Sequence, residues 1–263
     1  MGRRQIAGTG WKMNISATET GRYAQTLRRL LAAIDVSGLD IFVLPPFTSL
    51  HAAERAFAGS PVAHGGQNMH WDASGAWTGE ISAPMLTEAG CRYVELAHSE
   101  RLAHFGETYD LVEQKIVSAI EHGLTPILCL GETAEDKRLD KADQVLSEQL
   151  GTALAGLSAL RIPDVVLAYE PRWAIGAANA APPDYVAARH AALRALLEQR
   201  YGAAIAETTR VIYGGSVTSQ NGAELIGLPH VDGLFAGRAA WTPEGFFSII
   251  DIVNKAAQEK EAP

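Results

Sequence analysis

A carboxylate at Glu170 follows an apolar run and precedes a loop that contains Trp173 and Gly176. A glutamate in this position can abstract a proton from carbon if the loop closes over it and keeps water away. Such chemistry also needs a group that stabilises the negative charge developing on the substrate. A loop packed permanently against the body of the protein is the alternative interpretation of the same residues.

Two other residues, Lys12 and His98, can supply that stabilisation. His98 ends an apolar run and begins a predicted helix, whose positive end is expected to lower the imidazole pKa. A neutral imidazole can donate a hydrogen bond to a carbonyl oxygen. Lys12 follows the first predicted strand, where its ammonium group suits a phosphate or a developing enediolate oxygen. An ordinary solvated lysine is the alternative.

The segments Gly214-Gly215-Ser216 and Gly237 predict phosphate binding by backbone N–H groups. The first of these segments does not match a nucleophile elbow, because Thr218 replaces the final glycine. Residues 8–13 do not match a dinucleotide-binding fingerprint, because Met13 replaces the third glycine. A phosphate group is therefore the predicted ligand of the two glycine segments, with a simple turn as the alternative.

The sequence contains no recognisable metal-binding or cofactor-binding motif. The spacing of His98 and His104 matches no common pair of metal ligands, and Cys91 and Cys129 form no C-x-x-C pair. Cys129 ends the fifth predicted strand and is interpreted as a small buried residue that supports Glu170, rather than as a nucleophile. We therefore expect a site that works without a metal or a cofactor.

The size and charge of the chain limit its possible partners. Its 263 residues are enough for one large domain, predicted to span residues 1–263. The net charge of −8 argues against nucleic acid or an anionic membrane as a partner, but not against a small anionic substrate. Residues 1–6 lack an apolar signal core, and no apolar run approaches the roughly 18 residues that a membrane span needs. With only two cysteines, this pattern predicts a cytoplasmic protein.

Short apolar runs alternate with longer segments that carry helix start signals. Most of the runs are continuously apolar, as expected for parallel strands covered on both faces. Helices are predicted to begin near Ser16, Pro183 and Pro243. The pattern predicts an α/β protein with a single (β/α)8 barrel, eight parallel strands ringed by helices, and a doubly wound open sheet is the alternative. The predicted strands are Gln5–Gly10, Asp40–Leu44, Val62–Gly65, Arg92–Ala97, Pro126–Leu130, Val165–Tyr169, Arg210–Tyr213 and Gly233–Ala236.

The candidate residues occupy equivalent positions in this pattern. Lys12 follows the first strand, His98 the fourth, Glu170 the sixth, residues 214–216 the seventh and Gly237 the eighth. The C-terminal ends of the strands of a barrel meet at one rim, where active sites form. These residues are therefore predicted to share one site.

Several segments, in order along nearly the whole chain, resemble the triosephosphate isomerase family. They are residues 11–14, 67–68, 77–82, 98–101, 104–108, 131–133, 168–176 and 213–217. The resemblance implies a TIM-barrel isomerase that moves a proton through an enediolate intermediate. It implies Glu170 as the base, His98 as the group that polarises the carbonyl and Lys12 as the group that stabilises negative charge.

The resemblance also implies supporting roles for other residues. Glu100 would order the site behind Lys12. The family works as a homodimer, in which the loop from Gln67 to Glu80 brings Thr78 near the active site of the partner. No cofactor and no metal are implied. The residues implied in phosphate binding are Lys12, Gly176, Ser216 and Gly237.

The chain departs from the family pattern at the predicted rim. Gly10 stands where the family has an active-site asparagine, and Arg238 replaces the second glycine of the eighth loop. Residues 177–180, on the far side of the loop after Glu170, also differ. Arg238 either grips the phosphate or a substrate hydroxyl, or points outward into a surface ion pair. Because base, imidazole and lysine are all present, these departures concern the choice of substrate.

Residues 69–71, 75–77, 229–235 and 237–241 resemble a branch that contains the L-erythrulose-1-phosphate isomerases of erythritol catabolism. For that branch the implied reaction forms D-erythrulose 4-phosphate by the same enediol chemistry, and Gly10 could make space for the extra hydroxymethyl group of the substrate. Triosephosphate isomerase itself, which serves glycolysis and gluconeogenesis, is the alternative. A barrel that binds phosphate without catalysis and a phosphate-binding barrel of amino-acid biosynthesis are more remote alternatives.

Overall fold

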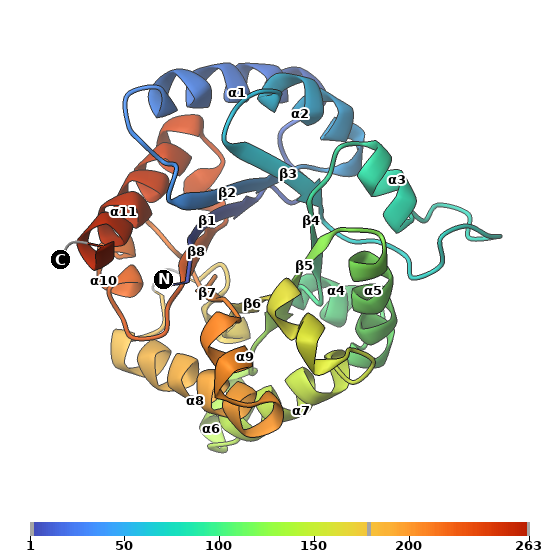
Figure 1. Ribbon diagram of the computed structural model, residues 1–263, viewed down its shortest axis with the longest axis vertical. Coiled ribbons are helices and arrows are strands. Elements are labelled where there is room, and N and C mark those ends of the chain that lie inside the picture. The colour runs from blue at the N-terminus through green and yellow to red at the C-terminus, as the bar shows by residue number, and fades with distance from the viewer. Residues whose placement is uncertain (1–2, 178–179, 262–263) are drawn as a thin grey trace.

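The computed structural model describes residues 3–177 and 180–261. The eight predicted strands are parallel and form a closed barrel in the order β1 to β8, in which β1 also pairs with β8. Figure 1 looks along this barrel, with the helices arranged around the outside of the strands. The predicted (β/α)8 barrel is confirmed and the open sheet is excluded. Residues 1–2, together with Ala178 and Asn179 of the segment 177–180 that departs from the family pattern, lie outside the described residues.

Each strand begins and ends within one residue of its predicted position. The agreement follows from burial on both faces, which makes each strand a compact apolar run with sharp polar or glycine boundaries. The strands are β1 (Gln5–Gly10), β2 (Leu39–Leu44), β3 (Val62–Gly66), β4 (Tyr93–Leu96), β5 (Thr125–Leu130), β6 (Val166–Tyr169), β7 (Val211–Tyr213) and β8 (Gly233–Ala236).

The helices begin where their capping signals predict. Ser16 caps the first helix: its hydroxyl accepts from the Glu19 N–H at 3.4 Å, and the Glu19 carboxylate accepts from the Ser16 N–H at 2.7 Å. A cap of this kind contributes about 1 kcal/mol. Among the described helices, none is both long enough and apolar enough to cross a bilayer. The α-helices are α1 (Ala17–Leu31), α2 (Leu50–Phe57), α3 (Ala83–Glu88), α4 (Ser99–His104), α5 (Tyr109–Glu121), α6 (Ala134–Arg138), α7 (Ala142–Ala153), α8 (Pro183–Tyr201), α9 (Ala203–Thr208), α10 (Gly222–Ile226) and α11 (Pro243–Glu261), and the 3-10 helices are η1 (Phe47–Ser49), η2 (Ala159–Asp164), η3 (Arg172–Ala174) and η4 (Arg238–Ala240).

Side chains alternate between the inside of the barrel and the layer beneath the helices. On β2, Phe42 belongs to the interior cluster, whereas its neighbours Ile41 and Val43 belong to the outer core. Gly8 leaves space for the Phe42 ring, since a Cβ at Gly8 would lie 2.2 Å from Cζ of that ring. Side chains thus fill the interior of the barrel, and a substrate can bind only at the rim.

A long loop, residues 67–82, projects from the barrel beside α3 (Figure 1). At its base the Gln67 side-chain amide donates to the carbonyl oxygens of Lys12 (2.9 Å) and Leu44 (2.8 Å). Farther out, Thr78 is exposed and the Trp77 side chain is 46% exposed. The loop therefore connects the rim of the barrel to an exposed surface.

Candidate active site

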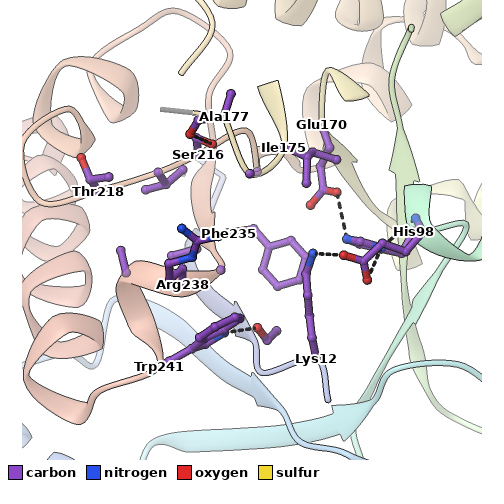
Figure 2. A pocket seen from close by; sticks show the side chains of 18 of the residues that line it. Lys12, His98, Glu170, Ile175, Ala177, Ser216, Thr218, Phe235, Arg238 and Trp241 are labelled. Carbon is purple, nitrogen blue, oxygen red and sulfur yellow. Dashed lines mark hydrogen bonds and ion pairs between the residues drawn. The ribbon is translucent and has the colours of Figure 1, made fainter. Parts of the chain in front are cut away.

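A cavity of about 590 Å³ opens at the C-terminal ends of the strands. Figure 2 shows Lys12, His98 and Glu170 pointing into the same space from β1, β4 and β6. The structure therefore brings the three chemically active candidates into one cavity rather than into separate ones. The predicted site residues that line it are Gly10, Lys12, His98, Glu100, Glu170, Gly176, Ser216, Gly237 and Arg238.

Glu170 is fixed at the end of β6 by its backbone and by the space left for its side chain. Its N–H donates to the Leu130 carbonyl oxygen at 2.7 Å. A Cβ at Gly214 would lie 2.3 Å from Glu170 Oε1, so only glycine at that position accommodates the carboxyl group. Burial, and next the nearby Glu95 carboxyl, raise the pKa of Glu170 well above its usual value. Once ionised, such a carboxylate is a stronger base than a solvated one.

The contacts of the His98 ring define its neutral tautomer. Nδ1 accepts a hydrogen bond from the Glu100 backbone N–H at 3.2 Å, so the proton of the neutral ring lies on Nε2. Nε2 lies 3.8 Å from Glu170 Oε2. Burial, followed by the ammonium group of Lys12, lowers the pKa of His98 to about 4. This direction agrees with the expected neutral imidazole, and burial is its largest cause.

Lys12 projects into the cavity, and its backbone and its ammonium group each have a partner. Its backbone adopts a left-handed φ of 51°, and the hydrogen bond from Gln67 to its carbonyl oxygen stabilises this conformation. Its Nζ lies 2.5 Å from Glu100 Oε1. The other Glu100 oxygen lies 3.7 Å from His98 Nδ1, so Glu100 contacts both groups.

The loop that follows Glu170 starts with η3 and is anchored by Trp173. Trp173 Nε1 donates to Glu132 Oε1 at 2.6 Å, and the Tyr185 hydroxyl donates to the same oxygen at 3.0 Å. The Lys137 ammonium lies 3.4 Å from the centre of the Trp173 ring, a cation–π contact. This end of the loop is thus fixed by a polar network around one buried carboxylate, Glu132.

The cavity side of the same loop is tied to the segment after β7. The Ser216 hydroxyl donates to the Ala174 carbonyl oxygen at 2.6 Å. Beyond the loop, the Ala181 N–H donates to the Tyr213 hydroxyl at 3.3 Å. Gly176 lines the cavity with a φ of 70°, a conformation that favours glycine. In this arrangement the loop lies over the edge of the cavity.

In the glycine segment after β7, the Gly214 N–H has a backbone partner, so phosphate binding by this segment stays a prediction for its other N–H groups. The Gly214 N–H donates to the Tyr169 carbonyl oxygen at 3.0 Å, so it belongs to the barrel and not to a ligand site. Gly215 is required by packing, because a Cβ there would lie 2.4 Å from the Tyr213 hydroxyl. Of this segment, Gly214 and Ser216 line the cavity, as does Gly237.

Known proteins share both the sequence and the fold described above. The family model for triosephosphate isomerase matches residues 5–253. The chain belongs to the triosephosphate isomerase family. An L-erythrulose-1-phosphate isomerase of Rhizobium rhizogenes is 44% identical over 256 residues, 97% of this chain and 95% of that protein. One of Mycolicibacterium smegmatis is 42% identical over 246 residues, 93% and 91% of the two chains. The crystal structure of triosephosphate isomerase from Bartonella henselae has a TM-score of 0.85 and 32% identity, covering 95% of this chain and 98% of that one.

Two departures from the triosephosphate isomerase family pattern lie in the cavity. Gly10, in the place of the family asparagine, accepts a hydrogen bond at its carbonyl oxygen from Trp241 Nε1 at 3.2 Å. Arg238 lines the cavity, and Figure 2 shows it on the same side as Thr218 and Trp241. Within residues 3–177 and 180–261, its guanidinium group forms no ion pair, so this part of the chain offers no support for the alternative of an outward ion pair.

One further cavity residue, Glu95, was not predicted from the sequence. It lies on β4, two residues after Tyr93 of the interior cluster, and therefore points into the barrel. Its side chain is 6% exposed, and burial raises its pKa to about 7. The available signal was a single acidic residue within an apolar strand, which reveals a site only when the inward face of the strand is known.

Cys129 lies beneath the catalytic candidates of this family barrel. Its Sγ is 3.9 Å from Glu95 Oε1, and burial raises the pKa of the thiol well above its usual value. A protonated, buried thiol fits a supporting residue better than a nucleophile. Among the described residues, Glu95, Cys129 and Glu170 form the one group whose donor atoms, all within 4.8 Å, could hold a metal ion. To bind a metal ion these three groups would have to lose their protons, and burial raises the pKa of each of them. Catalysis without a metal stays a prediction.

Proposed function

We propose that this protein isomerises a short-chain sugar phosphate, and that it converts L-erythrulose 1-phosphate to D-erythrulose 4-phosphate. The observation that carries the proposal is the convergence of Glu170, His98 and Lys12 on one cavity in a family barrel. The relatives named L-erythrulose-1-phosphate isomerase, at 42% to 44% identity, support the choice of substrate.

The proposed reaction is a proton transfer between two interior carbons, counted here from the carbon that carries the phosphate. Glu170 removes the proton on C3, and the electrons of that bond form the C2–C3 double bond of an enediolate. The Nε2–H of His98 and the Lys12 ammonium stabilise the oxygen on C2. Glu170 then returns its proton to C2, while the hydroxyl proton passes from the C3 oxygen to the C2 oxygen through His98. The carbonyl group ends at C3.

The phosphate is proposed to bind on the other side of the cavity, at Ser216, Gly237 and Arg238. These residues line the cavity together with Gly176 of the loop. The ammonium group of Lys12, which also lines the cavity, adds positive charge. A guanidinium group can bind two phosphate oxygens at once. This grouping supports binding of a dianion by a chain whose net charge is −8.

The surroundings of Gly10 support a substrate larger than a triose phosphate. A Cβ at Gly10 would come no closer than 3.5 Å to any neighbouring atom, which is ordinary van der Waals contact. Glycine is therefore required here neither by a close approach nor by a left-handed backbone. The space that the family asparagine would fill is available to a hydroxymethyl group.

Steady-state kinetics on two substrates test the proposal. We expect kcat/KM for L-erythrulose 1-phosphate to exceed that for D-glyceraldehyde 3-phosphate by about tenfold or more, as a fitted substituent provides. Metal-free catalysis predicts that kcat is the same with and without EDTA in the assay buffer. A preference for the triose phosphate would contradict the tetrulose assignment.

Triosephosphate isomerase activity is the second candidate, favoured by the family match and by the fold of the Bartonella henselae enzyme. It would place the protein in glycolysis and gluconeogenesis, whereas the tetrulose activity would place it in erythritol catabolism. A barrel that only binds phosphate is separated from both by solvent deuterium, which it would not incorporate into a bound ketose phosphate.

We further propose a cytoplasmic homodimer in which residues 1–263 form one isomerase domain. The exposed loop of residues 67–82, with Trp77 and Thr78, supports an interface on that side of the barrel. Size-exclusion chromatography with light scattering would measure the mass in solution, and the mass of a monomer would contradict the dimer.

A further inference from the structure

Glu95 borders the space that is left at Gly10. The position of a Cβ on Gly10 lies 3.9 Å from Glu95 Oε1, and 3.5 Å from the ring of Phe235 on β8. Gly10, Glu95 and Phe235 all line the cavity. A group that occupies this space would therefore contact an aromatic ring on one side and a carboxyl group on the other.

The Glu95 carboxyl group lacks a strong hydrogen-bond partner within the described part of the chain. Its one hydrogen bond there involves the weak thiol donor of Cys129 at 3.9 Å. Glu95 is only 6% exposed and lies opposite Ile127 of β5, a residue of the apolar interior cluster. A buried carboxyl with so few partners is costly, and buried polar groups in proteins normally have partners. A ligand hydroxyl would provide one.

The position of Glu95 relates it to one particular end of a substrate. Its oxygen lies within 4.8 Å of a Glu170 oxygen, so it is adjacent to the proposed base. Figure 2 shows Ser216 and Arg238, the proposed phosphate ligands, on the opposite side of the cavity from Glu170 and His98. The end of the substrate that is remote from the phosphate would therefore reach Glu95.

We propose that Glu95 binds the terminal hydroxyl group of the substrate, in the space at Gly10, and so selects a four-carbon over a three-carbon sugar phosphate. This inference rests on the proposed isomerase function and names a specificity-determining residue for it. A carboxyl can donate to a hydroxyl when protonated and accept from it when ionised, and burial places its pKa at about 7. The hydrogen atom that a triose aldehyde carries at this place offers no such bond.

Two substitutions at Glu95 test the proposal, each measured with both substrates. Glu95→Leu removes the polar group at similar volume, and we expect the ratio of kcat/KM for L-erythrulose 1-phosphate over D-glyceraldehyde 3-phosphate to fall about 10- to 100-fold. Most of that change should appear in KM. Glu95→Gln keeps a hydrogen-bonding group, and we expect it to retain that ratio within about fivefold. An equal loss on both substrates, with an unchanged ratio, would show that Glu95 acts only through Glu170.

Unreactive ligands give a second readout that does not depend on turnover. Calorimetry would compare erythritol 4-phosphate with glycerol 3-phosphate, which differ by one hydroxymethyl group. We expect the wild-type protein to favour the four-carbon ligand, and Glu95→Leu to lose that preference. Retention of the preference in Glu95→Leu would overturn the proposal. A wild-type protein that turns over the triose phosphate better would instead contradict the proposed function, so the two failures are distinguishable.

Discussion

Burial acts in opposite directions on the two central side chains of the site. It raises the pKa of Glu170 and lowers that of His98 to about 4, because in both cases it disfavours the charged form. The neutral form is the useful one for His98, whereas Glu170 must ionise to accept a proton. Lys12 lowers the pKa of both groups. One ammonium group therefore helps to ionise the base and to keep the imidazole neutral.

Replacing the base tests its assigned role directly. Glu170→Gln retains the shape of the side chain but cannot accept the proton, and we expect kcat to fall by about 1,000-fold or more. Calorimetry with glycerol 3-phosphate should show binding within about threefold of wild type, since the phosphate ligands are unchanged. Glu148→Gln, on the exposed face of α7, is a matched control expected to leave kcat unchanged. A Glu170→Gln variant with near-normal kcat would remove this residue from the mechanism.

Glu95 should also impose a measurable pH dependence on stability. Its pKa is raised to about 7 in the folded protein, above the ordinary value of 4.5 expected on unfolding. The folded state therefore binds the proton more tightly, and its stability falls as pH rises from about 4.5 to about 7. We would measure the free energy of unfolding in urea for Glu95→Gln and for the wild type. The difference, variant minus wild type, should increase by about 1–3 kcal/mol from pH 4.5 to pH 8. If the variant and the wild type differ in unfolding free energy by the same amount at both pH values, the raised pKa of Glu95 would be contradicted.

At the scale of elements, the sequence predicts the strands and the starts of the helices. It does not predict which contacts individual residues at the rim make. Continuous apolar runs mark strands buried on both faces, and capping residues such as Ser16 act within their own turn. The role of Gly214 depends on the Glu170 side chain and on a backbone bond to Tyr169, which only the closed barrel brings together. Glu95 is missed because the sequence does not show which alternate residues of β4 point into the barrel.

The loop after Glu170 yields a prediction about its far attachment. The Tyr213 hydroxyl accepts from the Ala181 N–H, where the segment leading from the loop meets α8. Tyr213→Phe removes that bond, and we expect kcat/KM to fall about 2- to 10-fold, the effect of one hydrogen bond of about 0.5–1.5 kcal/mol. Steady-state kinetics measure it, with Tyr201→Phe at the end of α8 as the control. Unchanged kinetics in Tyr213→Phe would separate this contact from catalysis.

In the molecule as a whole, the apolar core and the charged groups of the site occupy different parts of the barrel. Apolar side chains fill its interior below the rim, while the charged groups gather at the C-terminal ends of the strands. Lys12 and Arg238 provide local positive charge for an anionic substrate although the chain as a whole is acidic. Large apolar side chains remain exposed outside this cavity, among them Met13 and Phe105 at 95% and 67% exposure. Single exposed apolar side chains are common on protein surfaces, so these residues alone do not mark a binding surface.

A substitution in the projecting loop tests the proposed homodimer. Thr78 is exposed near Trp77, and an arginine there would place a charge in the proposed interface. We expect Thr78→Arg to weaken the dimer about 100-fold or more, the effect of burying an unpaired charge. Sedimentation velocity over a concentration series would show the monomer, and kcat should fall on dilution in parallel, because the loop also holds Lys12 through Gln67. Thr208→Arg on the exposed end of α9 is the control, expected to remain dimeric. Full activity in a wild-type protein that sediments as a monomer would contradict the coupling between this loop and the active site.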